Sequence, residues 1–397
     1  MLEYMTAGES HGPQLTAIVN GFPAHVPVTA QGINRDLARR QAGYGRGERM
    51  KIEQDAVEIL SGVRFGKTMG SPITLVVRNR DYENWSDIMS PEPAEPDRKR
   101  VVTHPRPGHA DLPGCLLYGH HDARNILERA SARETAARVA AGSLCRFFLH
   151  EMGAVVFSHV ISIHDAAART EGFTLDELRI RAEESDVRCA DSNAAEDMRR
   201  RIDEARGRGD TIGGVVEIVA TGIPLGLGDV MTSSERLDGR LAGALMNIQA
   251  VKGVEIGMGF RAACEWGSRV HDAIHYSTGA EIHTPGRGPS GGFYHATNNA
   301  GGIEGGITNG EPLIMRIAVK PIPTMMTPKM SADLVTKEPF EASKERSDVC
   351  AVPAAGVVAE AAVCFVLADA FLRRFGGRSL PEIRARYDAA VRDMQNY

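Results

Sequence analysis

One long apolar run constrains the fold of this chain more than any other feature. It reads VPAAGVVAEAAVCFVLADAFLRRF, from Val352 to Phe375, and is long enough to cross a membrane. Glu360 and Asp369 interrupt it, however, and it is rich in alanine rather than leucine. The pattern therefore predicts a helix that is buried on most sides within a large core.

The composition is compatible with such a core. The chain has 397 residues, of which 43% are hydrophobic and 24% are charged, as in soluble globular proteins. No low-complexity linker divides it, so we expect residues 1–397 to form a single large α+β domain. The net charge of −5 argues against general nucleic-acid binding.

The cysteines and the first residues favour a cytoplasmic protein. The six cysteines show no C-x-x-C spacing, which predicts buried, reduced thiols. The N-terminus has neither the basic region nor the apolar stretch of a signal peptide, so none is expected. We therefore expect neither a membrane nor a nucleic acid as a partner.

Residue patterns predict a mixture of strands and helices. Segments rich in Val, Ile and Thr predict strands at 14–22, 71–79, 154–163, 213–223 and 312–322. Helices are predicted at 30–41, 125–152, 174–186, 193–206, 234–250 and 353–375. Thr174 with Glu177, and Asn193 with Glu196, have the spacing of capping boxes at two of the helix starts.

Two pairs of segments resemble each other within the chain. LTAIVNGFP at 15–23 is similar to VVEIVATGIP at 215–224. GKTMGSP at 66–72 and GITNGEP at 306–312 share the pattern G-x-T-x-G-x-P, and each leads into an apolar strand. Two related β-α-β halves, with a repeat at 6–80 and 206–322, would explain this order. Chance similarity of strands and turns is the alternative.

The segment GESHG, from Gly8 to Gly12, fits the G-x-S-x-G pattern of a hydrolase nucleophile. Ser10 is then a candidate nucleophile, His11 a candidate base, and a simple glycine-rich turn the third possibility. A nucleophile elbow requires a strand before the serine and a helix after it. Only seven residues precede Gly8 and a strand-like run follows, which counts against a hydrolase.

Arginine and glycine alternate in the stretch 34–55, where Arg39, Arg40, Arg46 and Arg49 flank three glycines. Glycine lets the backbone approach a ligand closely, and guanidinium groups match phosphate or carboxylate with two hydrogen bonds. The stretch therefore favours an anion site over a solvated basic face.

The loop HPRPGHADLPG at 104–114 carries a second candidate site. Its prolines and glycines exclude regular structure, so Arg106 and His109 would be held on a stiff loop with Asp111 nearby. Such a histidine is suited to acid–base chemistry, although a loop histidine is also often simply exposed.

A helical run at 124–142 carries Arg129 and Arg133 four residues apart, where they repel each other unless an anion lies between them. The alternative is that Glu128 and Glu134 neutralise them.

Two further segments are less specific. The glycine-rich loop 298–312 and the segment 319–326 with Lys320 could enclose a cofactor or lie on the surface. Asp348 precedes the long apolar helix and could cap it.

These residues indicate an enzyme for a small polyanionic substrate, with histidine and aspartate as proton carriers. The motifs that carry them also occur together in a known family. GESHG, RRQAGYGRGERM, SGVRFGKTMGSPI, RPGHADLPG, RASARETAARVAAG, GGIEGGITNGEP, KPIPT and RSD follow the order and spacing of the chorismate synthase family. The chain resembles that family from about residue 6 to residue 375, with Asn299 where many members have a basic residue.

The resemblance implies a fold and a reaction. The family fold is a β-α-β sandwich of two similar halves, usually assembled as a homotetramer. The implied reaction is a 1,4-elimination of phosphate from 5-enolpyruvylshikimate 3-phosphate, a carbon–oxygen lyase reaction that gives chorismate. It requires reduced FMN without net redox change. No flavin-reductase segment is visible, so reduced FMN would come from elsewhere, with NAD(P)H as the indirect reductant.

The resemblance also assigns roles to residues. His11 would protonate the leaving phosphate, His109 would assist protonation of the reduced flavin, and Asp348 would take part in removing the proton. Ser10 and Ser131 would support these groups. The substrate would be bound by Arg40, Arg46, Arg49, Arg106 and Arg133. The flavin would be bound by Arg129, Ala130, Ser131, Gln249, Ala250, Gly305, Lys320, Pro321, Ile322, Pro323, Thr324 and Arg346. No metal is implied. A binding module without catalysis remains the rival interpretation.

Overall fold

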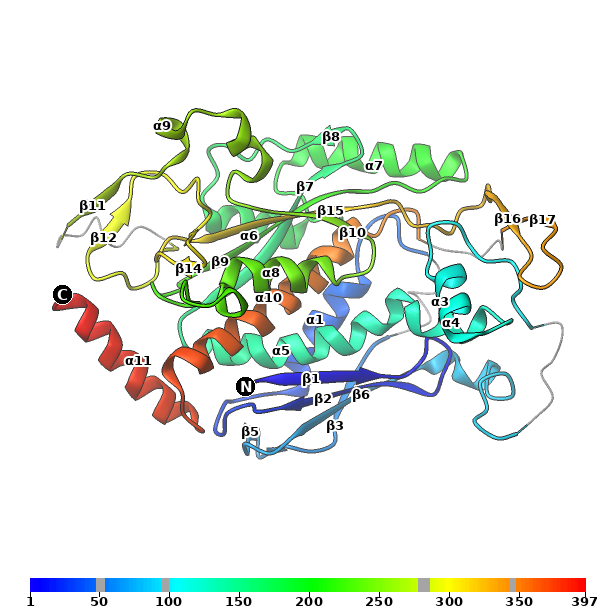
Figure 1. Cartoon of the computed structure of the whole chain (residues 1–397), viewed down its shortest axis with the longest axis horizontal. Coiled ribbons are helices and arrows are strands. Elements are labelled where there is room, and N and C mark those ends of the chain that lie inside the picture. The colour runs from blue at the N-terminus through cyan, green and yellow to red at the C-terminus, as the bar shows by residue number, and fades with distance from the viewer. Residues whose placement is uncertain (48–53, 94–99, 278–285, 343–347) are drawn as a thin grey trace.

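Two antiparallel sheets enclose a layer of helices. The computed structural model describes residues 1–397 except 48–53, 94–99, 278–285 and 343–347. In Figure 1 the first sheet lies below the central helices and the second lies above them. This is an α+β fold in a single domain, as expected.

The first sheet has the strand order β1-β2-β6-β3. Its strands are β1 (Glu3–Ala7), β2 (Gln14–Asn20), β6 (Ile73–Arg78) and β3 (Val57–Ile59). Alternate residues of β2, among them Leu15, Ala17 and Val19, are buried against the helices. The hairpin of β1 and β2 holds the GESHG segment at its turn, because Ala7 pairs with Thr16.

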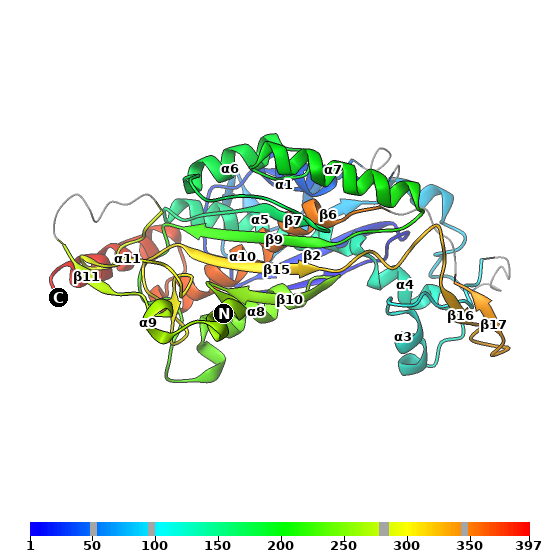
Figure 2. The ribbon, with the colours of Figure 1, turned by 90° about the horizontal axis from the view of Figure 1, so that it is seen from above.

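The second sheet has the order β10-β15-β9-β7-β8, with every neighbouring pair antiparallel. Its strands are β10 (Val251–Ile256), β15 (Leu313–Val319), β9 (Gly214–Thr221), β7 (Val155–Ile163) and β8 (Ala166–Ala167). Helices α6 and α7 cover part of its outer side (Figure 2). The predicted strand 312–322 ends at Val319, shortly before Pro321, which has no N–H to donate to a ladder.

Four short hairpins and ten helices complete the described fold. The hairpins are β4 (Val63–Arg64) with β5 (Lys67–Thr68), β11 (Ile274–Tyr276) with β12 (Phe293–His295), β13 (Ile303–Glu304) with β14 (Ile307–Thr308), and β16 (Met330–Ala332) with β17 (Pro339–Glu341). The α-helices are α1 (Ala30–Gln41), α3 (Asp111–Tyr118), α4 (Arg124–Ala130), α5 (Thr135–Glu151), α6 (Leu175–Glu184), α7 (Ser192–Gly207), α8 (Leu237–Met246), α9 (Gly267–Val270), α10 (Val352–Phe375) and α11 (Leu380–Gln395). Short 3-10 turns are η1 (Arg80–Asn84), η2 (Ala132–Glu134), η3 (Ser233–Glu235) and η4 (Gly259–Cys264).

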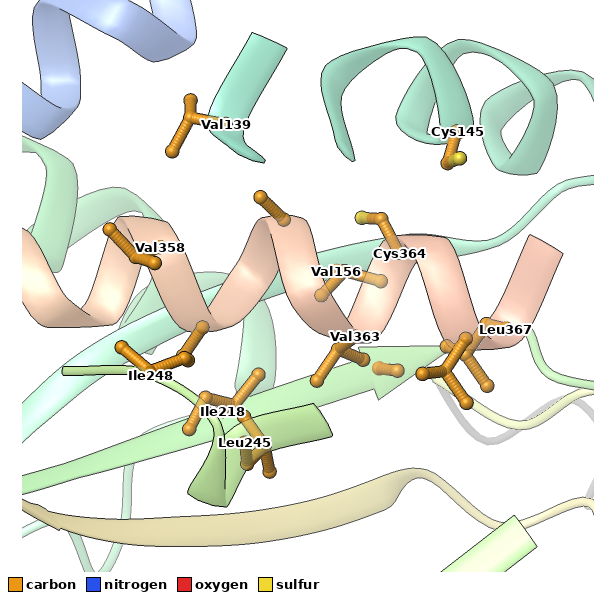
Figure 3. Packing of buried hydrophobic residues seen from close by; sticks show 14 of the residues in the cluster. Val139, Cys145, Val156, Ile218, Leu245, Ile248, Val358, Val363, Cys364 and Leu367 are labelled. Atoms are coloured by element: carbon orange, nitrogen blue, oxygen red, sulfur yellow. The ribbon is translucent and has the colours of Figure 1, made fainter. Parts of the chain in front are cut away.

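Helix α10 forms the centre of the core. It packs against α1, α5, α8, β7 and β9. In Figure 3, Val358, Val363 and Leu367 of α10 lie among side chains from α5, α8 and the second sheet. It is the helix in the described residues that is long and apolar enough to span a membrane, yet most of it is buried inside the protein. The prediction of a buried core helix is therefore confirmed.

Several predicted elements need correction. The helix predicted at 125–152 is divided, because Ser131 has an extended backbone and its side chain accepts a hydrogen bond from the backbone N–H of Arg133. The capping box of Thr174 is present, but α7 is capped by Asp191 rather than Asn193. Cys264 is exposed, whereas the other cysteines are buried as expected.

The segments 66–72 and 306–312 share a local arrangement. Thr68 Oγ1 donates to the carbonyl of Pro23 at 2.6 Å and accepts from Val26 N–H at 3.0 Å. Thr308 Oγ1 donates to the carbonyl of Pro224 at 2.6 Å and accepts from Leu227 N–H at 2.8 Å. The two threonines occupy the same place in the G-x-T-x-G-x-P pattern. On this basis we propose that 6–80 and 206–322 are related repeats.

Candidate active site

His11 is held by Glu128, a residue near the end of α4. The backbone N–H of His11 donates to Glu128 Oε2 at 2.8 Å, and the ring Nδ1 lies 2.9 Å from Glu128 Oε1. Burial opposes ionisation of Glu128, but the hydrogen bonds and charge of His11, with Arg124, lower the pKa of this carboxyl overall. The ring of Trp85 stacks on that of His11 with 4.0 Å between centroids.

Sequence analysis missed both of these partners. Glu128 was considered only as a neutralising charge for Arg129 and Arg133, whereas it pairs with His11 and Arg124. Nothing in the local pattern around Trp85 indicated a contact with residue 11.

A buried carboxylate, Asp55, joins two of the predicted substrate arginines. Arg40 Nη2 donates to Asp55 Oδ2 at 2.6 Å and Arg133 Nη1 donates to Asp55 Oδ1 at 2.5 Å. Burial and the neighbouring charges of Arg133 and Arg46 lower the pKa of Arg40 to about 10, although Asp55 opposes this. Among the described residues two guanidinium groups share one carboxylate here and Arg46 adds a third positive charge nearby, which is the electrostatic character of an anion site.

Asn79 connects this cluster to the GESHG loop. Its amide donates to the carbonyls of Glu9 and Gly12, at 3.1 and 2.7 Å, and its oxygen accepts from Arg133 Nε at 2.9 Å. The loop has a strand on either side, β1 and β2. The strand before Ser10 that a nucleophile elbow requires is therefore present, but the following helix is not.

Asp348 lies against the segment that follows α1. Its carboxylate accepts from Arg46 Nη1 at 2.5 Å and from the backbone N–H of Gly47 at 2.6 Å. It does not cap α10, which begins at Val352. The charge of Arg46 also helps to lower the pKa of Arg40, so the two arginines lie in one charged region. Arg49 and Arg346 are outside the described residues.

Arg106 and His109 share the carboxylate of Asp111. Arg106 Nε donates to Asp111 Oδ2 at 2.8 Å, and His109 Nδ1 lies 2.5 Å from Asp111 Oδ1. Burial opposes the charge on Asp111, but hydrogen bonds from His109 and Arg106 hold its pKa far below the usual range. Arg106 Nη1 also lies 3.4 Å from the hydroxyl of Thr324.

The predicted flavin-binding segment Lys320 to Thr324 adjoins the 104–114 loop and another predicted flavin-binding pair, Gln249 and Ala250. Lys320 Nζ donates to the carbonyl of Gly108 at 2.5 Å, and Lys320 N–H donates to the carbonyl of Ala250 at 2.9 Å. Gln249 Nε2 lies 3.4 Å from Glu134 Oε2. Pro321, Ile322 and Pro323 follow as a non-helical stretch, in which the Ile322 carbonyl accepts from the hydroxyl of Thr211 at 2.7 Å.

Ser131 was predicted both to bind the flavin and to support the catalytic groups. Ser131 is the residue before η2, and its hydroxyl donates to Ser10 Oγ at 3.2 Å. Arg129, two residues earlier, donates from Nη2 to the carbonyl of Thr6 at 3.0 Å, and Ala130 ends α4 between them. Gly305 is different, because it lies in the turn between β13 and β14, at the opposite end of Figure 1 from α4.

The arrangement combines an excess of buried positive charge with two histidines and an aspartate that can move protons. Such a site can bind a multiply charged anion and stabilise negative charge as a group departs.

Comparison with known proteins gives matches along nearly the whole chain. Residues 2–372 match the family model described as chorismate synthase. Chorismate synthase of Geobacter metallireducens is 55% identical over the whole of both chains, and that of Moorella thermoacetica is 58% identical over 98% of each. A crystal structure titled as chorismate synthase is 40% identical, with a TM-score of 0.79, and the match covers 100% of this chain and 99% of that one. The chain belongs to the chorismate synthase family.

Proposed function

We propose that the residues around His11, Asp55 and Asp348 carry out the chorismate synthase reaction in this chain. Phosphate and a C–H proton leave 5-enolpyruvylshikimate 3-phosphate by 1,4-elimination and chorismate is formed, in the shikimate pathway to aromatic compounds. The observation that carries the proposal is the gathering of Arg40, Arg133 and Arg46 around the carboxylates of Asp55 and Asp348.

The substrate carries a phosphate and two carboxylates, which need several cations at fixed positions. Arg40 and Arg133 are oriented by Asp55, Arg46 by Asp348 and Arg106 by Asp111. We assign substrate binding to these four and to Arg49. Cations that are already oriented stabilise the charge on the departing phosphate, by about 3 kcal/mol for one well-aimed group.

His11 is the proposed proton donor to the departing phosphate. Its ring is 17% exposed and one of its nitrogens is engaged by Glu128, so the other can face a ligand. Ser10 and Ser131 support this loop through their mutual hydrogen bond. Asp348 is the proposed acceptor of the substrate proton, held by Arg46 and by the Gly47 N–H.

The described residues fit reduced FMN. Gln249 Oε1 is a buried acceptor without a hydrogen-bond partner among the described residues, and an N–H or O–H of the cofactor would satisfy it. Arg129 and Lys320 supply positive charge for its phosphate, and Thr324 a hydroxyl. We propose that these residues hold FMN with Ala130, Ser131, Ala250, Pro321, Ile322, Pro323 and Arg346, and we leave out Gly305, which lies at the opposite end of the molecule from α4 (Figure 1). When bound, reduced FMN supplies electron density as phosphate leaves and recovers it as the hydrogen is removed.

His109 is proposed to hold a proton next to the cofactor. Asp111 accepts from its Nδ1, which fixes the ring, and Arg106 Nη2 lies 3.4 Å from Nε2, the nitrogen to which we assign exchange of that proton. We further propose that NAD(P)H is the indirect reductant and that the active form is a cytoplasmic homotetramer.

An anaerobic assay tests the function. Purified protein, chemically reduced FMN and 5-enolpyruvylshikimate 3-phosphate should release phosphate and chorismate in equal amounts. His11→Ala and Asp348→Ala should slow turnover far more than they weaken FMN binding. FMN binding without phosphate release would instead indicate a non-catalytic module, and labelling of Ser10 by a fluorophosphonate probe would favour a hydrolase.

A further inference from the structure

Glu128 contacts two consecutive residues of the GESHG loop. Its backbone carbonyl accepts from Ser10 N–H at 3.0 Å, and its side chain accepts from His11 N–H at 2.8 Å. The same carboxylate reaches the His11 ring, with Nδ1 at 2.9 Å from Oε1 and 3.0 Å from Oε2. Because Glu128 is only 2% exposed, water competes little for these hydrogen bonds.

The His11 ring is therefore held from two directions. Glu128 holds the edge that carries Nδ1, and Trp85 stacks on one face with an interplanar angle of 29°. Trp85 is itself covered by Arg124 and Arg100, whose guanidinium carbons lie 5.1 and 5.4 Å from its ring. A ring fixed at one edge and one face has a single remaining direction for Nε2, away from Glu128.

The carboxylate also decides where the proton lies on the ring. An ionised carboxylate only accepts hydrogen bonds, so Nδ1 must carry the hydrogen in this contact. Arg124 Nη1 donates to Glu128 Oε1 at 3.1 Å, which supports the ionised form. With Nδ1 protonated, the proton transferred in catalysis is the one on Nε2 of the imidazolium.

We propose that Glu128 is a positioning residue for His11, which keeps Nδ1 protonated and directs Nε2 toward the departing phosphate. The inference rests on the proposed role of His11, but it makes a separate claim about the ring. That claim can be measured without turnover.

Glu128→Gln tests the inference. The amide has the same shape, but only its oxygen can accept a hydrogen bond, whereas both oxygens of the carboxylate accept, from the His11 backbone N–H and from Nδ1–H. We expect kcat to fall by about 10- to 100-fold, with KM and the FMN dissociation constant unchanged within about twofold. Glu128→Asp, which retains the carboxylate, should recover part of the lost kcat. Glu58→Gln, at an exposed carboxylate of β3 that pairs with Arg78 of β6, is the matched control and should behave as the wild type.

The second readout is the protonation of the ring nitrogens. In protein with 15N-labelled histidine, the His11 signals are identified by their loss in His11→Gln. The wild-type protein should show protonated Nδ1, and Glu128→Gln should shift the signals toward unprotonated Nδ1. Wild-type kcat in Glu128→Gln, or an unchanged Nδ1 signal, would overturn the inference. A fall in thermal stability and FMN binding with an unchanged ring would indicate a purely structural residue and would equally overturn it.

The two proposals fail in different ways. If His11→Ala turned over normally, the proposed proton donor would be wrong, yet the ring signals of Glu128→Gln would still report whether Glu128 controls the ring.

Discussion

Two neighbouring arginines at the end of α1 belong to two different buried clusters, which differ in the number of carboxylates per arginine. Arg39 joins the Glu360 cluster and Arg40 joins the Asp55 cluster. The Glu360 cluster comprises Arg39, Arg146 and Arg188 with Asp36, Glu183 and Glu360. The Asp55 cluster comprises Arg40 and Arg133 with Asp55.

In the Glu360 cluster three arginines share three carboxylates, so the charges are equal in number. Glu360 is fully buried in α10 and accepts from Arg39 and Arg146 at 2.8 Å and from Arg188 at 3.1 Å. Burial alone would lower the pKa of Arg39, but Glu360 and Glu183 raise it above its usual range. These charges are satisfied within the protein and connect α1, α5 and α10.

In the part of the chain that the structure describes, the two arginines of the Asp55 cluster share one carboxylate, and Arg46 lies close enough to add to the repulsion. Burial lowers the pKa of both arginines; the carboxylates around Arg39 outweigh it, whereas around Arg40 burial and the neighbouring cations prevail and the pKa falls to about 10. The comparison teaches that burial of an arginine does not indicate its role. Where carboxylates are as numerous as the arginines, the ion pairs are structural. Where they are fewer, the site can accept an anion.

Removal of Glu360 should have the largest effect on stability. Glu360→Ala leaves three guanidinium groups without their shared partner in the core, and we expect a loss of about 3–5 kcal/mol in the free energy of unfolding. Urea denaturation measures it, with Glu196→Ala on the exposed side of α7 as the control. A loss below about 1 kcal/mol would mean that the cluster is not structural.

Arg40→Gln should show the opposite behaviour. Asp55 keeps Arg133 as a partner and the repulsion among the cations is relieved, so stability should change by less than about 1 kcal/mol. Turnover should fall by about 100-fold or more, because one donor to the departing phosphate is lost. Steady-state rates and urea denaturation on the same preparation distinguish the two effects. A variant that unfolds as readily as Glu360→Ala would show that this cluster is structural too.

Local patterns predicted the elements well but not the partners of the charges. Helix α1 begins and ends as predicted, and the capping box at Thr174 is present, because both depend on neighbouring residues. Arg40 was predicted to bind substrate, but its partner Asp55 was not identified. Successive helical residues point about 100° apart, so Arg39 and Arg40 must diverge. Which carboxylate each one meets depends on the packing of distant segments.

The same limit applies to His11. Its partner Glu128 is 117 positions away in the chain, and Trp85 is contributed by a third segment. The break at Ser131 was missed because its small side chain is compatible with a helix, whereas its hydroxyl accepts from Arg133 N–H and starts a new turn. Charge motifs therefore suggested candidate site residues, while the contacts among them required the fold.

Acid should weaken the Glu360 cluster over a defined range. Burial raises the pKa of Glu360, but Arg39, Arg146 and Arg188 lower it overall, from 4.5 to about 2. Because the folded-state pKa is the lower one, this stabilisation is complete above about pH 4.5 and is lost as pH falls toward 2. The stability difference between wild type and Glu360→Gln should shrink by on the order of 3 kcal/mol over this range. Urea denaturation at several pH values measures it, and a constant difference would contradict the assignment.

The smallest effect is expected at the edge of the same cluster. Glu183 contacts Arg39 and Arg188, but its side chain is 38% exposed, so solvent screens its charge. Glu183→Gln should cost less than about 1 kcal/mol, and the cost should disappear at high salt, because exposed ion pairs are screened. Urea denaturation at low and high ionic strength tests this against Glu360→Ala, whose cost should persist in salt. An equal, salt-independent loss in both variants would mean that Glu183 belongs to the buried part of the cluster, and that arginine–carboxylate balance must be counted over a larger set of residues.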